Sequence, residues 1–154
     1  SDQHVQNLVI VKISHHNRVG TTQAITAITR KNRKINFIEC DLLPQASIET
    51  RNFEIDVMCA NLPYIPTKTL QGLSIFGREP TLALDGGDDG FELIRRLMRI
   101  APDQLAPNSL MLFEIEESLG REAVALARQI YPSGMIELYK DLAGRDRLLE
   151  IQLP

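Results

Sequence analysis

The residues with the clearest capacity for chemistry are Asn61 and Tyr64, which directly follow an apolar run at positions 55–60. That run is short enough to be a buried parallel strand. Ligands of open α/β sheets bind beyond the carboxyl ends of the strands, so a polar and aromatic turn at this point is a candidate active site. A strand followed by a proline-rich turn without a chemical role is the alternative that the spacing leaves open.

Two prolines stiffen this turn. Pro63 and Pro66 fix their own φ angles and favour extended geometry at the residues that precede them. A stiff backbone keeps the Asn61 side chain and the neighbouring carbonyl groups aimed in one direction. The segment is therefore suited to holding an amide or amine group of a substrate.

Three segments carry a resemblance to a known family. Residues 61–64, Asn-Leu-Pro-Tyr, are similar to the Asn-Pro-Pro-Tyr signature of methyltransferases that modify a planar nitrogen, either in a side-chain amide or in the exocyclic amine of adenine. Residues 78–90 read Arg-Glu-Pro-Thr-Leu-Ala-Leu-Asp-Gly-Gly-Asp-Asp-Gly, and residues 141–147 read Asp-Leu-Ala-Gly-Arg-Asp-Arg. In this order they resemble the C-terminal catalytic domain of the HemK/PrmC family, the protein-(glutamine-N5) methyltransferases that act on peptide chain release factors. The resemblance runs from about Val9 to the end of the chain.

The resemblance implies S-adenosylmethionine as methyl donor and a glutamine in the Gly-Gly-Gln loop of a peptide chain release factor as acceptor. Acceptors on the two amide hydrogens would hold the nitrogen still and stabilise the positive charge that develops on it. The Asn61 side-chain oxygen and the Leu62 carbonyl are expected to form this pair, with Pro63 in the same substrate-binding segment. Tyr64 is expected to face the amide and the methylsulfonium, a favourable cation–π arrangement. Asn61 and Tyr64 are the candidate catalytic residues, although Tyr64 is also suited to a core-edge role.

The resemblance also implies which residues contact the cofactor. Asp41 would bind the exocyclic amine of adenine, Leu42 would lie against the ring, and Asn61 is the third candidate. From the sequence alone, Asp41 is equally suited to capping a helix or turn. No metal site is expected, because His15 and His16 have no third ligand nearby.

Two departures from the family pattern concern the cofactor. Class I methyltransferases carry a glycine-rich turn after their first strand, whereas the only early glycine here is Gly20. The family also places an acidic residue at the end of the second strand to hold ribose hydroxyls, and Lys12 stands at or close to that position. A cation cannot accept those hydrogen bonds, so Lys12 would weaken the cofactor site. Leu62 in place of the first proline is a minor change, since the carbonyl is retained.

Hydrophobic periodicity predicts the elements that position these residues. Alternating strands and helices predict an α/β fold with a mostly parallel sheet, and Gly144 allows the last two strands to pair as an antiparallel hairpin. This is the Rossmann-like layout of class I S-adenosylmethionine-dependent methyltransferases, which the resemblance independently implies. The predicted strands lie at 8–13, 35–40, 55–60, 109–115, 135–139 and 148–153, and the predicted helices at 19–30, 91–100 and 121–130.

The usual first strand of that fold has no counterpart in the sequence. Its absence is expected to leave unpaired backbone and apolar surface at the centre of the sheet. The segment 67–90 is long, contains several glycines and shows no clear hydrophobic period, as is typical of a loop that forms a lid or a substrate-binding surface. The whole chain, 1–154, is predicted to be a single, partial catalytic domain.

The amino-acid composition limits which cellular compartments and which partners are expected for this chain. The 44% apolar and 24% charged content is ordinary for a globular protein, and no run resembles a membrane span or a signal peptide. The net charge of −3 argues against broad binding of phosphate backbones. Cys40 and Cys59 are expected to be reduced packing thiols, which favours the cytoplasm.

Three functions remain open. The first is a fragment of a glutamine methyltransferase that acts on release factors. The second is methylation of adenine N6 in nucleic acid, which the acidic charge balance disfavours. The third is a degenerate domain that no longer binds the cofactor and serves protein interaction.

Overall fold

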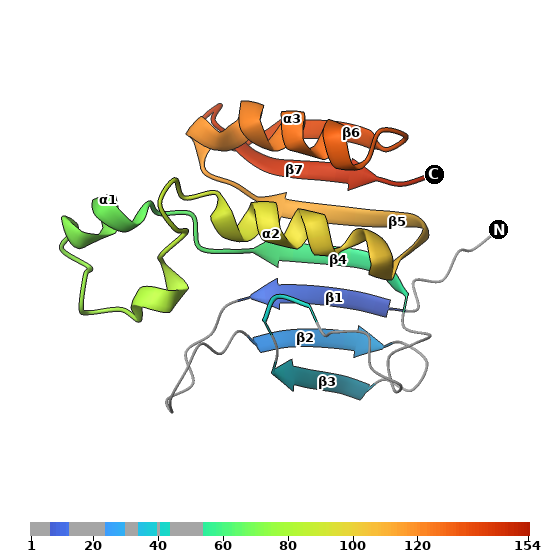
Figure 1. Ribbon diagram of the computed structural model, residues 1–154, viewed down its shortest axis with the longest axis horizontal. Helices are drawn as coiled ribbons and strands as arrows, with labels where there is room; N and C mark the ends of the chain where they lie inside the picture. Colours follow the sequence, from blue (N-terminus) through green and yellow to red (C-terminus); the bar gives the residue numbers. More distant parts are fainter. Residues whose placement is uncertain (1–6, 13–23, 30–33, 40, 44–53) are drawn as a thin grey trace.

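The computed structural model describes residues 7–12, 24–29, 34–39, 41–43 and 54–154. These residues form one seven-stranded sheet with the strand order β3-β2-β1-β4-β5-β7-β6 (Figure 1). The strands are β1 Asn7–Lys12, β2 Ala24–Thr29, β3 Lys34–Glu39, β4 Ile55–Asn61, β5 Leu105–Glu114, β6 Met135–Lys140 and β7 Asp146–Gln152. The helices are α1 Thr67–Gln71, α2 Glu92–Ile100 and α3 Gly120–Ile130, with short 3-10 segments at Thr81–Ala83, Pro102–Gln104 and Glu117–Leu119.

The centre of the sheet is parallel. β4 pairs in parallel with β1 on one side and with β5 on the other. The pairing register places Lys12 level with Asn61, and Asn61 level with Glu114. The carboxyl ends of three neighbouring strands therefore meet at one edge of the sheet, where ligands of such sheets bind.

The C-terminal hairpin is confirmed. β6 and β7 pair antiparallel, and β7 also pairs antiparallel with β5. Gly144 has a φ of +78° in the connecting turn, a left-handed conformation that glycine adopts without strain. The Asp141 carboxylate accepts the backbone N–H groups of Ala143 and Arg145 and so closes the turn.

The α/β class of the prediction is also confirmed, but its mostly parallel sheet is wrong. Among the described strands, two pairings are parallel and four are antiparallel. The predicted helix at 19–30 is wrong over Ala24–Thr29, which is strand β2 between β1 and β3. That segment reads Ala-Ile-Thr-Ala-Ile-Thr, and its β-branched residues favour a strand. Positions 19–23 and 30 lie outside the described residues.

The expected gap at the centre of the sheet is not found. β1 pairs with β2 on one side and with β4 on the other, so this strand itself takes a central place. Its backbone groups are paired in both ladders, and no edge is exposed between β2 and β4. The prediction of unpaired central backbone is therefore wrong for the described strands.

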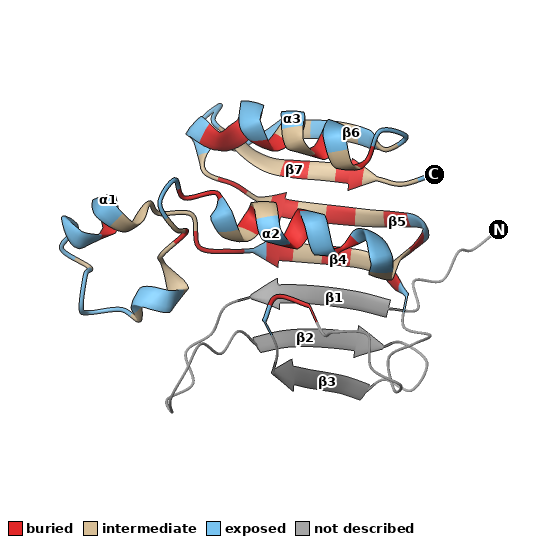
Figure 2. Cartoon of the chain, viewed as in Figure 1, coloured by how far each residue is buried: buried red, intermediate tan, exposed pale blue. Residues whose placement is uncertain are grey.

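The core lies between the sheet and the helices α2 and α3, which contact each other (Figures 1 and 2). Met58, Met111 and Phe113 from the strands and Leu97 from α2 are fully buried. The Tyr131 hydroxyl donates to the Met98 carbonyl over 2.7 Å, and burial raises the pKa of this hydroxyl. No helix among the described residues is long and apolar enough to cross a membrane.

Candidate active site

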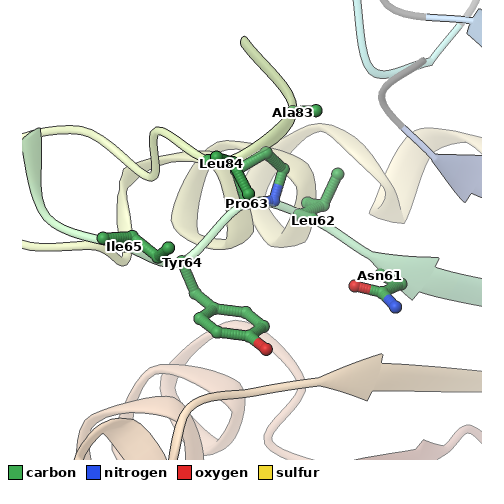
Figure 3. Close-up of a pocket in the computed structure, with 7 residues that line it drawn as sticks. All are labelled: Asn61, Leu62, Pro63, Tyr64, Ile65, Ala83 and Leu84. Atoms are coloured by element: carbon green, nitrogen blue, oxygen red, sulfur yellow. The ribbon is translucent and has the colours of Figure 1, made fainter. Parts of the chain in front are cut away.

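Asn61, the last residue of β4, lies at the edge of a pocket of about 260 Å³ (Figure 3). Side chains alternate along the strand end, so Leu62 is buried in the core while Asn61 is exposed. Burial of Leu62 anchors the turn, and the polar side chain is left outside the core. The pocket is lined by Asn61, Leu62, Pro63, Tyr64, Ile65, Ala83 and Leu84.

Asn61 is held by a partner that sequence reasoning missed. Its Nδ2 donates to Glu114 Oε2 over 2.8 Å. An ionised carboxylate only accepts hydrogen bonds, so the amide must present its nitrogen to Glu114. Figure 3 shows the Asn61 oxygen on the side of Pro63 and Tyr64, with the nitrogen turned away from them.

The Leu62 carbonyl is the second acceptor that the sequence suggested. Among the described residues it receives no hydrogen bond from either backbone or side chain. Two oxygens of neighbouring residues, the Asn61 side-chain oxygen and the Leu62 carbonyl, therefore have no hydrogen-bond donor among the described residues. An NH₂ group has two N–H donors, so two acceptors are what a planar amide requires.

Tyr64 lies between two pockets. It lines the pocket beside Asn61 and also a second one of about 360 Å³. Its half-buried ring packs against the edge of the core cluster, so the core-edge role suggested by the sequence is occupied as well. The second pocket is further lined by Ile65, Pro66, Thr69, Leu73, Asp89, Glu116, Ser118 and Leu119.

A glycine turn clamps the backbone of this corner. The Ile65 N–H donates to the Leu84 carbonyl over 3.2 Å, and the Gly86 N–H donates to the Ile65 carbonyl over 2.9 Å. A Cβ at Gly86 would lie 2.7 Å from the Tyr64 Cα, so only glycine fits there. Gly90 has a φ of +75° and faces the Tyr64 carbonyl at a separation that excludes any side chain. The Gly-Gly-Asp-Asp-Gly run thus serves close packing against the corner.

Asp89 belongs to a charged cluster beside the second pocket. Its carboxylate accepts the Phe91 N–H over 3.0 Å and pairs with Arg95 over 2.6 Å. Arg95 also pairs with Glu122 over 2.9 Å. The hydrogen bond from Arg95, followed by that from the Phe91 backbone, lowers the pKa of Asp89 below its ordinary value.

The two predicted adenine contacts differ in their surroundings. Asp41 is exposed, and its Oδ2 pairs with Arg96 Nη2 over 2.5 Å, which leaves Oδ1 without a partner among the described residues. Leu42 is fully buried in the core cluster and has a φ of +65°. Asp41 therefore keeps one carboxylate oxygen available, whereas Leu42 presents no apolar face to a ligand in this arrangement.

The cysteines and histidines that the sequence singled out are either packing residues or lie outside the described part of the chain. The Cys59 thiol is free and half-buried, and burial raises its pKa, as suits a packing thiol. Cys40, His15 and His16 lie outside the described residues. The part of the chain that the structure describes holds no cluster of three metal-ligating side chains.

The charged hairpin supports the segment after β5. Arg147 donates to the Ile115 carbonyl over 3.3 Å and lies 3.5 Å from Asp141. Arg145 pairs with Glu117 over 3.3 Å. These contacts give the charged residues of the hairpin a structural role.

A parallel sheet centre, an antiparallel C-terminal hairpin and an exposed amide at the end of the central strand β4 give an α/β domain that shares these features with the layout expected of class I methyltransferases. No family model matches the chain. Individual proteins do match it, among them three that are named release factor glutamine methyltransferase. The protein from Bacillus cereus is 31% identical over 142 residues, 88% of this chain and 50% of that protein. The protein from Moorella thermoacetica is 37% identical over 127 residues, 80% and 45% of the two chains.

The protein of that name from Thermosynechococcus vestitus is 36% identical over 103 residues, 66% of this chain and 35% of that protein. The chain is thus similar in sequence to these release factor glutamine methyltransferases, and it spans half or less of their length. The solved protein-(glutamine-N5) methyltransferase (release factor-specific) from Alicyclobacillus acidocaldarius is 22% identical. It aligns over 69% of this chain and 54% of that one, with a TM-score of 0.46.

Proposed function

We propose that this chain is a single, partial catalytic domain that transfers a methyl group from S-adenosylmethionine to the side-chain amide nitrogen of a glutamine in a peptide chain release factor. The observation that carries the proposal is the Asn61 side chain, exposed beside a pocket at the carboxyl end of a central parallel strand. Similarity to proteins named release factor glutamine methyltransferase supports the choice of acceptor.

The acceptor amide would lie in the pocket beside Asn61. The Asn61 oxygen and the Leu62 carbonyl would each accept one N–H of the glutamine NH₂ group. These two hydrogen bonds would fix the position of the nitrogen and stabilise the positive charge that develops on it. They would do so because the rigid backbone after β4 holds both oxygens in place before the substrate binds. No strong base is required, since the proton can leave to water once the charge has formed.

The Tyr64 ring would lie against the planar face of the acceptor amide. An aromatic face near a developing cation contributes about 0.5–2 kcal/mol. Its place between the two pockets lets the ring separate the glutamine side chain from the peptide that bears it. The second pocket, beyond Tyr64, offers room for the residues that flank the glutamine in a Gly-Gly-Gln loop.

S-adenosylmethionine would supply an electrophilic methyl carbon when bound. Asp41 would accept the exocyclic amine of adenine through Oδ1, the oxygen that Arg96 leaves free. Leu42 would have to turn out of the core to lie against the ring. Asn61 would then contact both the cofactor and the acceptor, at the junction of their sites.

One observation favours a second candidate, a methyltransferase-like domain without activity. Lys12 ends β1 level with Asn61, at the strand end next to the proposed site. A lysine cannot accept hydrogen bonds from ribose hydroxyls. Loss of cofactor binding would leave the domain to protein interaction alone.

Two measurements test the proposal. Calorimetry with S-adenosylmethionine separates a methyltransferase from an inactive domain, since an inactive domain would give no heat even at about millimolar cofactor, near the weak end of measurable affinities. Methylation of a Gly-Gly-Gln peptide and of an adenine oligonucleotide is then compared. Methyl transfer to the peptide alone supports the proposal, and transfer to the oligonucleotide alone contradicts it.

The acceptor role of Asn61 is tested by Asn61→Ala. Turnover on the peptide should fall sharply, while the affinity for the cofactor should fall less. Unchanged turnover would remove the amide grip from the proposal.

A further inference from the structure

Glu114 and Asn61 end two neighbouring parallel strands at the same level of the sheet. Residues paired in register share a face, so both side chains leave the sheet on the face opposite the buried Leu62. The contact between Nδ2 and Oε2 measures 2.8 Å, within the range of a hydrogen bond to a charged acceptor. The sequence separation of 53 residues makes this a contact that only the fold creates.

The orientation of the Asn61 amide decides what the pocket can bind. An oxygen aimed at the pocket accepts from an NH₂ group, whereas a nitrogen aimed at it donates to a carbonyl. A free asparagine side chain can exchange these two orientations by rotation about its last bond. A carboxylate at its nitrogen removes one of them, because two acceptors facing each other repel.

We propose that Glu114 is a positioning residue that holds the Asn61 oxygen toward the pocket and thereby selects an acceptor bearing an NH₂ group. The inference rests on the proposed function of the corner and adds a residue that does not touch the substrate. It accounts for the arrangement in Figure 3, where the oxygen faces Pro63 and Tyr64.

The charge of Glu114 also acts on the site. The cation Arg147, on the neighbouring strand β7, pairs with Asp141 and with the Ile115 carbonyl. The Glu114 carboxylate accepts from the Asn61 amide, so its negative charge stands at the Asn61 nitrogen. It polarises the amide, makes its oxygen a stronger acceptor, and favours positive charge on the bound nitrogen.

Two substitutions of Glu114 separate its proposed role in orienting the Asn61 amide from a role in packing. Glu114→Gln keeps the shape but can either accept from Nδ2 or donate to the Asn61 oxygen, so both orientations of the amide become available. Glu114→Ala removes the partner. The matched control is Glu150→Gln on β7, because Glu150 pairs in register with Leu112 and shares the sheet face of Glu114 without contacting Asn61.

The first readout does not require activity. In nitrogen-edited NMR spectra of the whole chain, the Asn61 side-chain NH₂ pair is identified by its disappearance in Asn61→Asp. The hydrogen-bonded Nδ2 proton should exchange with water about tenfold faster in Glu114→Ala, which corresponds to the loss of one charge-assisted bond. Glu114→Gln should shift the signal as well, and Glu150→Gln should leave it in place. An Asn61 signal with the same shift and exchange rate in all variants overturns the inference.

The second readout is kinetic. Glu114→Gln should lower kcat on the Gly-Gly-Gln peptide about tenfold or more with a smaller change in KM and an unchanged unfolding midpoint. Equal activity of wild type and Glu114→Gln would overturn the inference even where the NMR signal shifts. An inactive wild-type chain would instead contradict the proposed function, and the NMR test would still decide the position of the amide.

Discussion

The Thr67 hydroxyl donates to Asp85 Oδ1 over 2.7 Å, and the same oxygen accepts the Gly87 N–H over 3.0 Å. One carboxylate thus joins the first residue of α1 to the glycine turn that lies against Tyr64. In Figure 1, α1 projects beyond the carboxyl ends of β1, β4 and β5. The Asp85 carboxylate therefore fixes the start of the long segment that extends from the sheet. The geometry of the corner after β4 depends on it.

Asp85→Ala should destabilise the protein by about 1–3 kcal/mol, because it leaves the Thr67 hydroxyl and the Gly87 N–H without their acceptor. The measurement is the midpoint of urea unfolding, together with amide exchange at residues 84–90. Exchange in that segment should accelerate more than exchange in α3. Asp103→Ala, at an exposed position far along the chain, is the control and should change neither. Equal effects of the two substitutions would contradict the bracing role.

A second prediction concerns the close approach of Gly90 to the Tyr64 carbonyl. Gly90 and Gly144 have nearly equal φ angles, +75° and +78°, but only Gly90 has neighbours within reach of a Cβ. Gly144→Ala should therefore cost about 1–2 kcal/mol for the left-handed backbone alone. Gly90→Ala should cost about 1–3 kcal/mol more, because its methyl group displaces the corner.

Denaturant midpoints of the two variants measure that difference directly. Gly90→Ala should also reduce methyl transfer to the Gly-Gly-Gln peptide, since the backbone around Asn61 moves with Tyr64. Identical stability losses in the two alanine variants would show that the corner tolerates the extra methyl group.

A third prediction concerns acid stability. The hydrogen bond from Arg95 lowers the pKa of Asp89 in the folded protein below its unfolded value, which is about 3.9. A depressed pKa gives a stabilising contribution that is complete above the unfolded value and is lost as the pH falls through the folded value. Stability of the wild type should consequently fall more steeply below about pH 4 than that of Asp89→Asn.

Urea midpoints measured from neutral pH down to the acid transition test this relationship. The difference between the two proteins should shrink in high salt, because the Asp89 carboxylate is half exposed and salt screens it. Asp103→Asn serves as the reference for removal of an exposed carboxylate. Parallel curves for wild type and Asp89→Asn would refute the prediction.

The C-terminal half of the fold could be predicted from the sequence because its signals are local. Apolar residues recur with helical period through α2, and Gly144 marks the reversal between β6 and β7. β2 was mistaken for a helix because Ala-Ile-Thr-Ala-Ile-Thr satisfies both periods in part. What decides its state is pairing with β1 and β3, which no window of sequence contains.

In the candidate site, too, features with local sequence signals could be predicted and features that depend on distant residues could not. Asn61 and Tyr64 stand together in the sequence after an evident strand, so their exposure on one turn could be predicted. Glu114 could not be connected to them, although it lies within a predicted strand, because its role depends on β5 lying beside β4 in register. Burial of Leu42 was likewise set by distant core residues rather than by its neighbours in the chain.

The last prediction separates the ring of Tyr64 from its hydroxyl. Tyr64→Phe keeps an aromatic face toward the pocket beside Asn61 and should retain turnover within about twofold, since the proposed contact uses the ring. Tyr64→Leu keeps apolar packing at the core edge but removes the face, and should lower kcat about tenfold. Tyr139→Leu, at an exposed position on β6, is the control for loss of a tyrosine and should leave turnover unchanged.

Unfolding midpoints distinguish this role from that of a core-edge ring. If Tyr64 serves packing alone, Tyr64→Leu should lower the midpoint and turnover should follow only the fraction of folded protein. If the ring faces the acceptor amide, kcat should fall at temperatures where the variant is fully folded, and the effect on cofactor affinity should be smaller. Full activity of folded Tyr64→Leu would leave Asn61 and the Leu62 carbonyl as the complete grip on the amide.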